Sequence, residues 1–322
     1  MTKRAWWLAA MLVALCACQR SEPGPDAAAI AAKKAKAEQV FFAENAAWRE
    51  QRRQELLQPD GWTSLVGLHW LEPGAHYIGS GSSSGIRLAV GPAKMGMLVL
   101  KQDRVEFSPE SGAALTLDGE PLKGRTELLS DHGQAPSVIG FDEGKGKLTV
   151  IKRGDRYALR VKHADAPSRV NFAGVRYWNA DPSWRVVAKF VANPPGKAIP
   201  VVDIVGTVTD SPNPGAVEFV RGGRTYRIEA LAEDDSGDLF LVFADRTSGH
   251  GSYPAGRFLD AAKPDARGNV VLDFNRAYDP PCAFTPFATC PLPPPENRID
   301  LAIDAGEKTY AHPEPVPDKE SR

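Results

Sequence analysis

Cysteine is scarce in this sequence, which limits the chemistry that its thiols can perform. Only four of the 322 residues are cysteines, and two of them, Cys16 and Cys18, end the N-terminal apolar segment. Cys282 and Cys290 remain in the body of the chain, where a close pair is a disulfide candidate if the protein is exported. A metal site would need two further ligands, and no histidine lies nearby. We therefore favour a disulfide over a metal site.

An excess of basic charge is also missing. The sequence has 39 Lys and Arg residues against 40 Asp and Glu residues, which gives a net charge of −1. Nonspecific binding to nucleic acid needs a basic field, so we expect no nucleic-acid partner. After the N-terminal segment there is no apolar run of the roughly 20 residues that a membrane-spanning helix needs. The body of the chain is therefore not expected to cross a membrane.

Familiar catalytic and cofactor motifs are absent as well. The six histidines are scattered and do not have the spacing of metal ligands. No Gly-x-Ser-x-Gly segment lies between a strand and a helix, and Gly79-Ser80-Gly81 lacks the context of a nucleotide-binding loop. We expect no metal and no cofactor, and the sequence assigns no catalytic residue.

The first 17 residues have the pattern of an export signal. Lys3 and Arg4 precede an apolar stretch at 5–15 that is too short to span a membrane. The segment Leu15-Cys16-Ala17-Cys18 resembles the lipobox of bacterial lipoproteins, which implies cleavage after Ala17 and diacylation of Cys18. An ordinary signal peptide with chance cysteines is the alternative.

The resemblance implies a lipid-anchored protein of the bacterial cell envelope that faces the periplasm and has the membrane as a partner. Gln19 follows the cysteine, which favours the outer membrane by similarity to Gram-negative sorting patterns. Without Lys3 and Arg4, 37 basic residues face 40 acidic ones, and the net charge becomes −3. Residues 18–36 are rich in Ala, Lys, Pro and Glu and are predicted to be a lipidated tether.

Periodicity then predicts one helix followed by many strands. Apolar residues recur at helical spacing over 37–57, and Pro59-Asp60-Gly61 ends this helix. The 29 glycines and 27 prolines are spread between short apolar segments, which is typical of strands joined by tight turns. We predict that residues 37–164 contain the helix and a β-sandwich-like half. The segment 79–88 resembles the opening of a forkhead-associated sandwich, but the phosphate-binding arginine of that family is missing.

A second β half is predicted over 165–310. Its clearest feature is a meander of three antiparallel strands at 217–221, 225–231 and 239–243, with turns at Gly222-Gly223 and around Asp235-Ser236-Gly237. The fold class is therefore mainly β, and the second half is a β-meander or barrel with a long Pro-rich loop. Residues 311–322 are polar and are predicted to be a disordered tail.

The region 245–307 is the candidate functional region. It has little regular structure, and it interleaves polar side chains with aromatics and prolines, which suits a rigid polar pocket. The ligand-binding candidates in it are Arg257, Asp273, Asn275, Tyr278, Glu296, Asn297 and Glu307.

Each candidate has a structural alternative. Arg257 suits a carboxylate or phosphate ligand, or a buried ion pair with Asp273, Glu296 or Glu307. Asp273 and Asn275 suit a water or a sugar hydroxyl, or the capping of a turn. Glu296 and Asn297 suit a general base with its orienting amide, or the start of a helix. Tyr278 is equally suited to a core position.

The same region carries a family resemblance. The runs 272–278 (LDFNRAY), 280–286 (PPCAFTP) and 289–293 (TCPLP) resemble the domain-of-unknown-function family numbered 1684. The segment from Asp60-Gly61-Trp62 through Trp70-Leu71 and the segment 153–156 (RGDR) also match, so that the resemblance extends over about 48–308. Asp279 stands where the resemblance leads us to expect Asn. The family includes members without export signals, which leaves free thiols or metal ligands open as roles for Cys282 and Cys290.

The family implies no activity, so three functions remain. The leading hypothesis is an envelope lipoprotein that binds a small polar ligand or a glycan in a pocket of the 245–307 region. The alternative is a hydrolase that uses Asp273 and Glu296 as a carboxylate pair. The third is a structural envelope protein in which Arg257, Asp273 and Glu307 form a closed network.

Overall fold

The structure is a computed structural model that describes residues 25–132, 135–232 and 236–313. The predicted signal peptide, the lipidation site Cys18 and most of the predicted tail lie outside these residues. The chain divides into two compact units, 1–42 and 43–322, and the predicted boundary at 164 falls inside the second unit. No helix in the described part of the chain is long and apolar enough to cross a bilayer.

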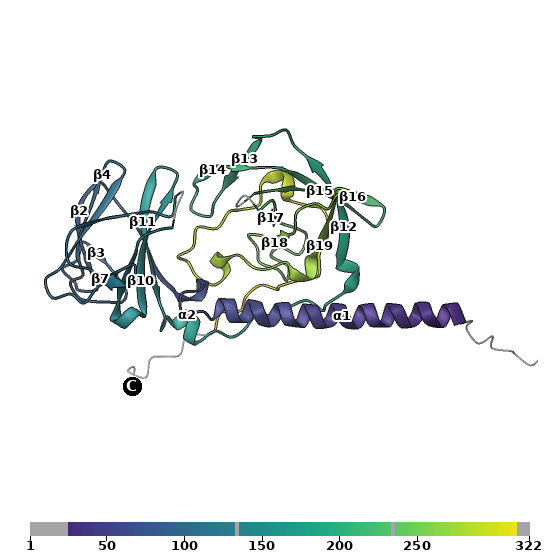
Figure 1. Cartoon of the computed structure of the whole chain (residues 1–322), viewed down its shortest axis with the longest axis horizontal. Helices are drawn as coiled ribbons and strands as arrows, with labels where there is room; N and C mark the ends of the chain where they lie inside the picture. The colour runs from purple at the N-terminus through teal and green to yellow at the C-terminus, as the bar shows by residue number, and fades with distance from the viewer. Residues whose placement is uncertain (1–24, 133–134, 233–235, 314–322) are drawn as a thin grey trace, which may run out of the picture. The chain divides into compact units, whose positions relative to one another are not determined.

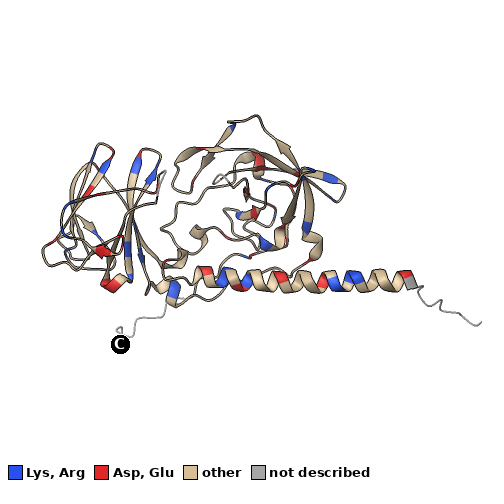
Figure 2. Cartoon of the chain, in the orientation of Figure 1, with Lys and Arg blue, Asp and Glu red and all other residues tan. Residues whose placement is uncertain are grey.

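The helix α1 (Pro25–Leu56) begins well before the predicted start at residue 37. Residues 25–36, which we expected to belong to a tether, are helical. Alanine and lysine, which dominate this segment, have high helix propensities, and Pro25 suits the first turn. Charges of both signs follow one another along α1 (Figure 2), and Arg53 pairs with Glu50 one turn away at 2.7 Å.

The predicted sandwich of the first half is confirmed. Its strands are β1 (Leu65–Trp70), β2 (Gly74–Gly79), β3 (Ile86–Arg87), β4 (Gly96–Lys101), β5 (Arg104–Pro109), β6 (Thr116–Leu117), β7 (Glu120–Pro121), β8 (Thr126–Leu128), β9 (Val138–Phe141), β10 (Gly146–Arg153) and β11 (Arg156–His163) (Figure 1). They form one sheet in the order β1-β11-β10-β9-β6-β7 and another in the order β3-β2-β4-β5-β8. Leu98 and Phe107 from one sheet share a buried core with Leu148 and Leu159 from the other. The likeness to a forkhead-associated domain stays a prediction.

Short helical turns connect these elements. They are η1 (Trp62–Ser64), η2 (Asp142–Gly144), α2 (Pro167–Val170) and η3 (Pro182–Trp184).

The second half contains three open sheets. Its strands are β12 (Arg185–Ala192), β13 (Ala198–Val202), β14 (Val208–Pro212), β15 (Gly215–Arg221), β16 (Arg224–Ala230), β17 (Leu239–Phe243), β18 (Arg257–Ala261) and β19 (Asn269–Asp273). Four of them form a sheet in the order β16-β15-β12-β19, while β13 pairs with β14 and β17 pairs with β18. No sheet of the described residues closes into a barrel, so the barrel form of the prediction is wrong.

The third strand of the predicted meander has a different partner. β15 and β16 form the expected hairpin, but β17 pairs with β18, and its bridge to the hairpin, between Leu231 and Phe240, lies just beyond the end of β16. The reason is that both faces of β17 are buried. Leu239 and Leu241 pack in one apolar cluster, whereas Phe240 and Val242 pack in another. β17 therefore divides two cores, and β18 supplies its backbone partner.

Residues 274–313, which follow β19, form a long loop, as predicted. Within these described residues the helical turns are η4 (Phe274–Arg276), η5 (Pro281–Ala283) and η6 (Pro295–Asn297). Prolines begin η5 and η6, which fixes the backbone where each turn starts. This loop lies beside β17 and β18 (Figure 1), and bridges join Phe258 to Tyr278 and Ala244 to Arg298.

Candidate functional site

Arg257, the first candidate, is fully buried, and its hydrogen bonds go to groups of the protein itself. Its guanidinium donates to the backbone carbonyl of Ile303 at 2.9 Å, to that of Ala305, and to that of Glu307 at 3.3 Å. Its ion-pair partner is Asp245, at 3.5 Å. Arg257 therefore fastens the C-terminal loop to β18, and its carboxylate partner is none of the three that we had considered.

Glu307 belongs to the same buried network. One carboxylate oxygen accepts from Arg52 Nε of α1 at 3.0 Å, and the other accepts from the backbone N–H of Asp279 at 2.7 Å. Gly306 makes this approach possible. Its φ is +80°, and a Cβ there would collide with the carbonyls of Phe274 and Ala277.

Asp279 is the unusual member of this network. It is fully buried, and no described side chain donates a hydrogen bond to its carboxyl oxygens, although the backbone N–H of Tyr310 lies near enough to favour the ionised form. Burial, and then the negative charge of Glu307, raise the pKa of Asp279 to about 8. The carboxyl group of Asp279 is therefore neutral at pH 7. The two ion pairs beside it, Arg52 with Glu307 and Arg257 with Asp245, then balance in charge.

Asp273 and Asn275 hold the end of β19 in place. Asp273 Oδ2 accepts from Arg185 Nε at 2.8 Å, and Asp273 Oδ1 accepts from Asn275 Nδ2 at 2.9 Å. Asn275 in turn donates to the carbonyl of Asp181 and accepts from its N–H, each at 2.9 Å. Asp273 and Asn275 therefore have the role of capping a turn, which was the structural alternative to ligand binding, because these bonds close the turn at η4.

The remaining candidates are spread over different surroundings. Buried Asn297 bridges the backbone of Glu229 and the carbonyl of Val242, with bonds of 2.7–2.9 Å. Glu296 beside it is exposed. Tyr278 lies under the guanidinium of Arg52, with 4.7 Å from its ring centroid to the Arg52 carbon. Asp273 is buried and held by Arg185 and Asn275, whereas Glu296 is exposed, and the carboxylate-pair hypothesis stays a prediction.

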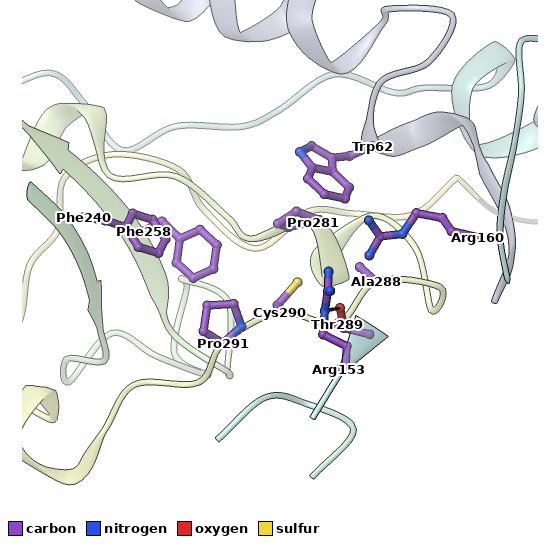
Figure 3. Close-up of a pocket in the computed structure, with 10 residues that line it drawn as sticks. All are labelled: Trp62, Arg153, Arg160, Phe240, Phe258, Pro281, Ala288, Thr289, Cys290 and Pro291. Carbon is purple, nitrogen blue, oxygen red and sulfur yellow. Dashed lines mark hydrogen bonds between the residues drawn. The ribbon is translucent and has the colours of Figure 1, made fainter. Parts of the chain in front are cut away.

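A cavity lies where the candidate loop meets the first half of the chain, and we call it the Arg160 cavity (Figure 3). It has a volume of about 250 Å³. Its lining residues are Trp62, Arg153, Arg160, Phe240, Phe258, Pro281, Ala288, Thr289, Cys290 and Pro291. Most of them come from the loop or from β17 and β18, and they form an apolar wall opposite two arginines.

Strand alternation directs both arginines into this cavity. On β11, Leu159 and Val161 face the sandwich core, so Arg160 faces the opposite side of the sheet. Arg153 ends the neighbouring strand β10, and its guanidinium is held by Asp131 at 2.9 Å and by Thr289 Oγ1 at 3.0 Å. Arg153 is therefore neutralised and tied to the loop.

Arg160 has no such neutralising partner. In the described part of the chain no carboxylate forms an ion pair with it, and its buried Nε has no hydrogen-bond acceptor. Its guanidinium carbon lies 5.7 Å from the ring centroid of Trp62, whose ring is partly exposed. Desolvation, and then the like charge of Arg153, lower the pKa of Arg160. The carboxylate of Asp131 opposes this shift without touching Arg160, because it pairs directly with Arg153. Arg160 is therefore a poorly solvated cation without an ion-pair partner of its own.

The two cysteines of the loop are free thiols. The predicted disulfide is thus not formed in this structure, although the pair is close. The backbone N–H of Cys282 donates to Cys290 Sγ at 3.0 Å, and the two side chains share a hydrogen bond. No group of three or more potential metal-binding side chains occurs among the described residues.

None of the seven predicted binding residues lines the Arg160 cavity, and four of its lining residues, Trp62, Arg153, Arg160 and Phe240, lie outside the predicted region 245–307. Trp62 and Arg153 lie in the segments that carried the family resemblance outside the main loop, which was the available signal. The sequence contains no signal for Arg160, because charged residues at alternate positions of a strand are the ordinary pattern of a solvated face.

Comparisons with known proteins agree with that resemblance over part of the chain. A family model described as "Protein of unknown function (DUF1684)" matches residues 170–308. This match contains the loop and its cysteines. It does not include the first half of the chain, which contributes Trp62, Arg153 and Arg160 to the cavity. No curated protein matches the chain.

The chain is also similar to a solved structure of an archaeal protein. That structure is the solution NMR structure of the uncharacterized protein from gene locus rrnAC0354 of Haloarcula marismortui. The two sequences are 32% identical over 44% of this chain and 79% of the archaeal chain, with a TM-score of 0.36.

Proposed function

We propose that this chain, which belongs to the DUF1684 family, binds a small anionic molecule in the Arg160 cavity. The observation that carries the proposal is the half-buried guanidinium of Arg160, which forms no ion pair with a carboxylate of the described residues. A buried charge without a partner is costly, and a bound anion would remove this cost.

The chemistry of the lining residues defines the class of ligand. Arg160 can form two parallel hydrogen bonds with one carboxylate or phosphate group. Trp62 offers a flat apolar face beside it, and Phe258 and Pro291 extend the apolar wall. A volume of about 250 Å³ suits a molecule of monosaccharide size. The proposed ligand is therefore a small carboxylate or phosphate ester, such as an acidic or phosphorylated sugar.

Titration calorimetry of the soluble body (from residue 36) with glucuronate, glucose 6-phosphate, inorganic phosphate and glucose tests this proposal. We expect binding of at least one anion and none of uncharged glucose. In Arg160→Gln the affinity for that anion should fall about 10- to 100-fold, because charge-assisted hydrogen bonds contribute about 1.5–3 kcal/mol.

Arg156→Gln is the matched control. Arg156 lies on the same face of β11 but is exposed and stacks on Trp70 at 3.8 Å, so its loss changes the net charge equally without touching the cavity. Full affinity in Arg160→Gln, or an equal loss in both variants, would rule the cavity out as the binding site.

We also propose that the protein is a lipoprotein of the cell envelope that is anchored through Cys18 and faces the periplasm, with the outer membrane as its expected location. The support is the N-terminal sequence, in which a basic start, a short apolar segment and a lipobox-like tetrapeptide follow one another.

Metabolic labelling with an alkyne-bearing fatty acid tests the anchor. When the full chain is expressed in a Gram-negative bacterium, we expect label on the wild type and on Cys16→Ala but none on Cys18→Ala. Label that persists in Cys18→Ala, or an unlabelled wild type, would contradict the lipoprotein assignment.

A further inference from the structure

Cys282 and Cys290 are placed for a reaction that anion binding does not use. They lie eight positions apart on either side of a short segment of the loop, and the N–H of Cys282 donates to Cys290 Sγ at 3.0 Å. Their thiols are hydrogen-bonded to each other although both are free. The two sulfur atoms are thus already neighbours in the reduced protein.

The surroundings of the two thiols differ. Cys282 is partly exposed, and the hydroxyl of Tyr253 donates to its backbone carbonyl at 3.2 Å. Cys290 is buried in the loop and contributes to the wall of the Arg160 cavity. An oxidant in solution therefore has easier access to Cys282, whereas Cys290 is reached through the cavity or through Cys282.

We propose that Cys282 and Cys290 form a thiol–disulfide exchange site whose co-substrate is a small disulfide. In the first step, Cys282 Sγ attacks one sulfur of the small disulfide, the S–S bond breaks and one small thiolate leaves. In the second step, Cys290 loses its proton and attacks Cys282 Sγ, which releases the second small thiolate. The two thiolates take up the two protons, so the protein loses two hydrogens and the small disulfide gains them.

Exposure assigns the order of the two steps, because Cys282 is partly exposed and Cys290 is buried. The hydrogen bond that the two thiols share favours the same order, since it lowers the pKa of Cys282. The thiolate is the attacking species, so Cys282 reacts first. Once Cys282 is bonded to the small thiol, it no longer accepts that hydrogen bond, and Cys290 becomes easier to deprotonate.

Arg160 assists the second step. The hydrogen bond with Cys282 and burial raise the pKa of Cys290, and the positive charge of Arg160, which lines the same cavity, opposes that rise. A guanidinium without a carboxylate partner is thus available to stabilise the thiolate that closes the disulfide. This role does not require that the cavity binds any anion, so the exchange site can be tested separately from the proposed function.

The experiment uses the full chain, reduced and then treated with oxidised glutathione at neutral pH. Samples are quenched with N-ethylmaleimide and mapped by mass spectrometry, which separates Cys282 and Cys290 from Cys16 and Cys18. We expect a peptide pair linked through Cys282 and Cys290 that is reversed by dithiothreitol. Cys290→Ser should accumulate glutathione on Cys282, and Cys282→Ser should react at least ten times more slowly.

A measurement on the wild type needs no variant to fold. Brief treatment with iodoacetamide under native conditions should modify Cys282 before Cys290. The proposal fails if oxidised glutathione gives no Cys282–Cys290 link while both thiols are alkylated readily. Faster reaction of Cys290 than of Cys282 would overturn the assigned order, and with it the role of Arg160.

Discussion

Asp279→Asn should stabilise the protein more and more as the pH rises from 4 to 8. The pKa of Asp279 is about 8 in the folded protein and about 4 in an unfolded chain. The folded state therefore holds a proton that the unfolded state releases. The stability gained from this proton is complete below pH 4 and is lost as the pH rises to about 8.

The expected size follows from the same shift. Each pH unit between the two pKa values costs the wild type about 1.4 kcal/mol, so the difference approaches roughly 5 kcal/mol at pH 8. Asn has the shape of the neutral carboxyl group and cannot ionise. It is also the residue that the family resemblance leads us to expect here.

Urea unfolding of both proteins from pH 4.5 to 9 measures the effect. The free-energy difference should grow with pH and level off above pH 8. Asp103→Asn is the control, since this exposed aspartate should leave the pH profile unchanged. A difference that does not vary with pH would show that Asp279 is ionised in the folded protein.

Arg257→Met should lower the free energy of unfolding by about 3–5 kcal/mol. The methionine fills part of the space, but it leaves Asp245 as a buried charge without its partner. It also leaves the carbonyls of Ile303 and Ala305 without their donor. The C-terminal loop would lose its attachment to β18.

A double variant separates the charge from the hydrogen bonds. Asp245→Asn in the Arg257→Met background removes the unpaired charge, so it should recover part of the loss in urea unfolding. Arg246→Met is the control, because this exposed arginine pairs with Asp300 at the surface and should cost less than about 1 kcal/mol. A stable Arg257→Met protein that has lost its affinity for anions would instead make Arg257 a ligand-binding residue.

The local elements of the fold and its tight hairpins could be predicted from the sequence, but strand partners that are distant in sequence could not. The hairpin of β15 and β16 follows from Gly222-Gly223 and the flanking alternation, which are local signals. The pairing of β17 with β18 depends on two cores that its alternate side chains separate, and the segment itself has five apolar residues without a period. A run of this kind does not reveal which strand will lie beside it.

The candidate site shows the same limit. The loop was recognised because proline, aromatic and polar residues alternate in it, and it does line the Arg160 cavity. The polar residues chosen within it are those that hold the loop together, because a buried polar group must find a partner. Arg160 differs from the other buried arginines because it has no ion pair with a described carboxylate. The sequence cannot show this, because the neighbours of Arg160 are defined only in the folded chain.

The contact between Arg52 and Glu307 joins residues 255 positions apart. Loops of that length close late in folding, because their entropy must be lost before the contact forms. A chain that emerges N-terminus first, from a ribosome or through a translocation channel, holds Arg52 in the open until almost the whole sequence has followed. The buried network can therefore form only after Glu307 has emerged. Until then the C-terminal half of α1 is exposed and can bind another segment of the chain or another protein.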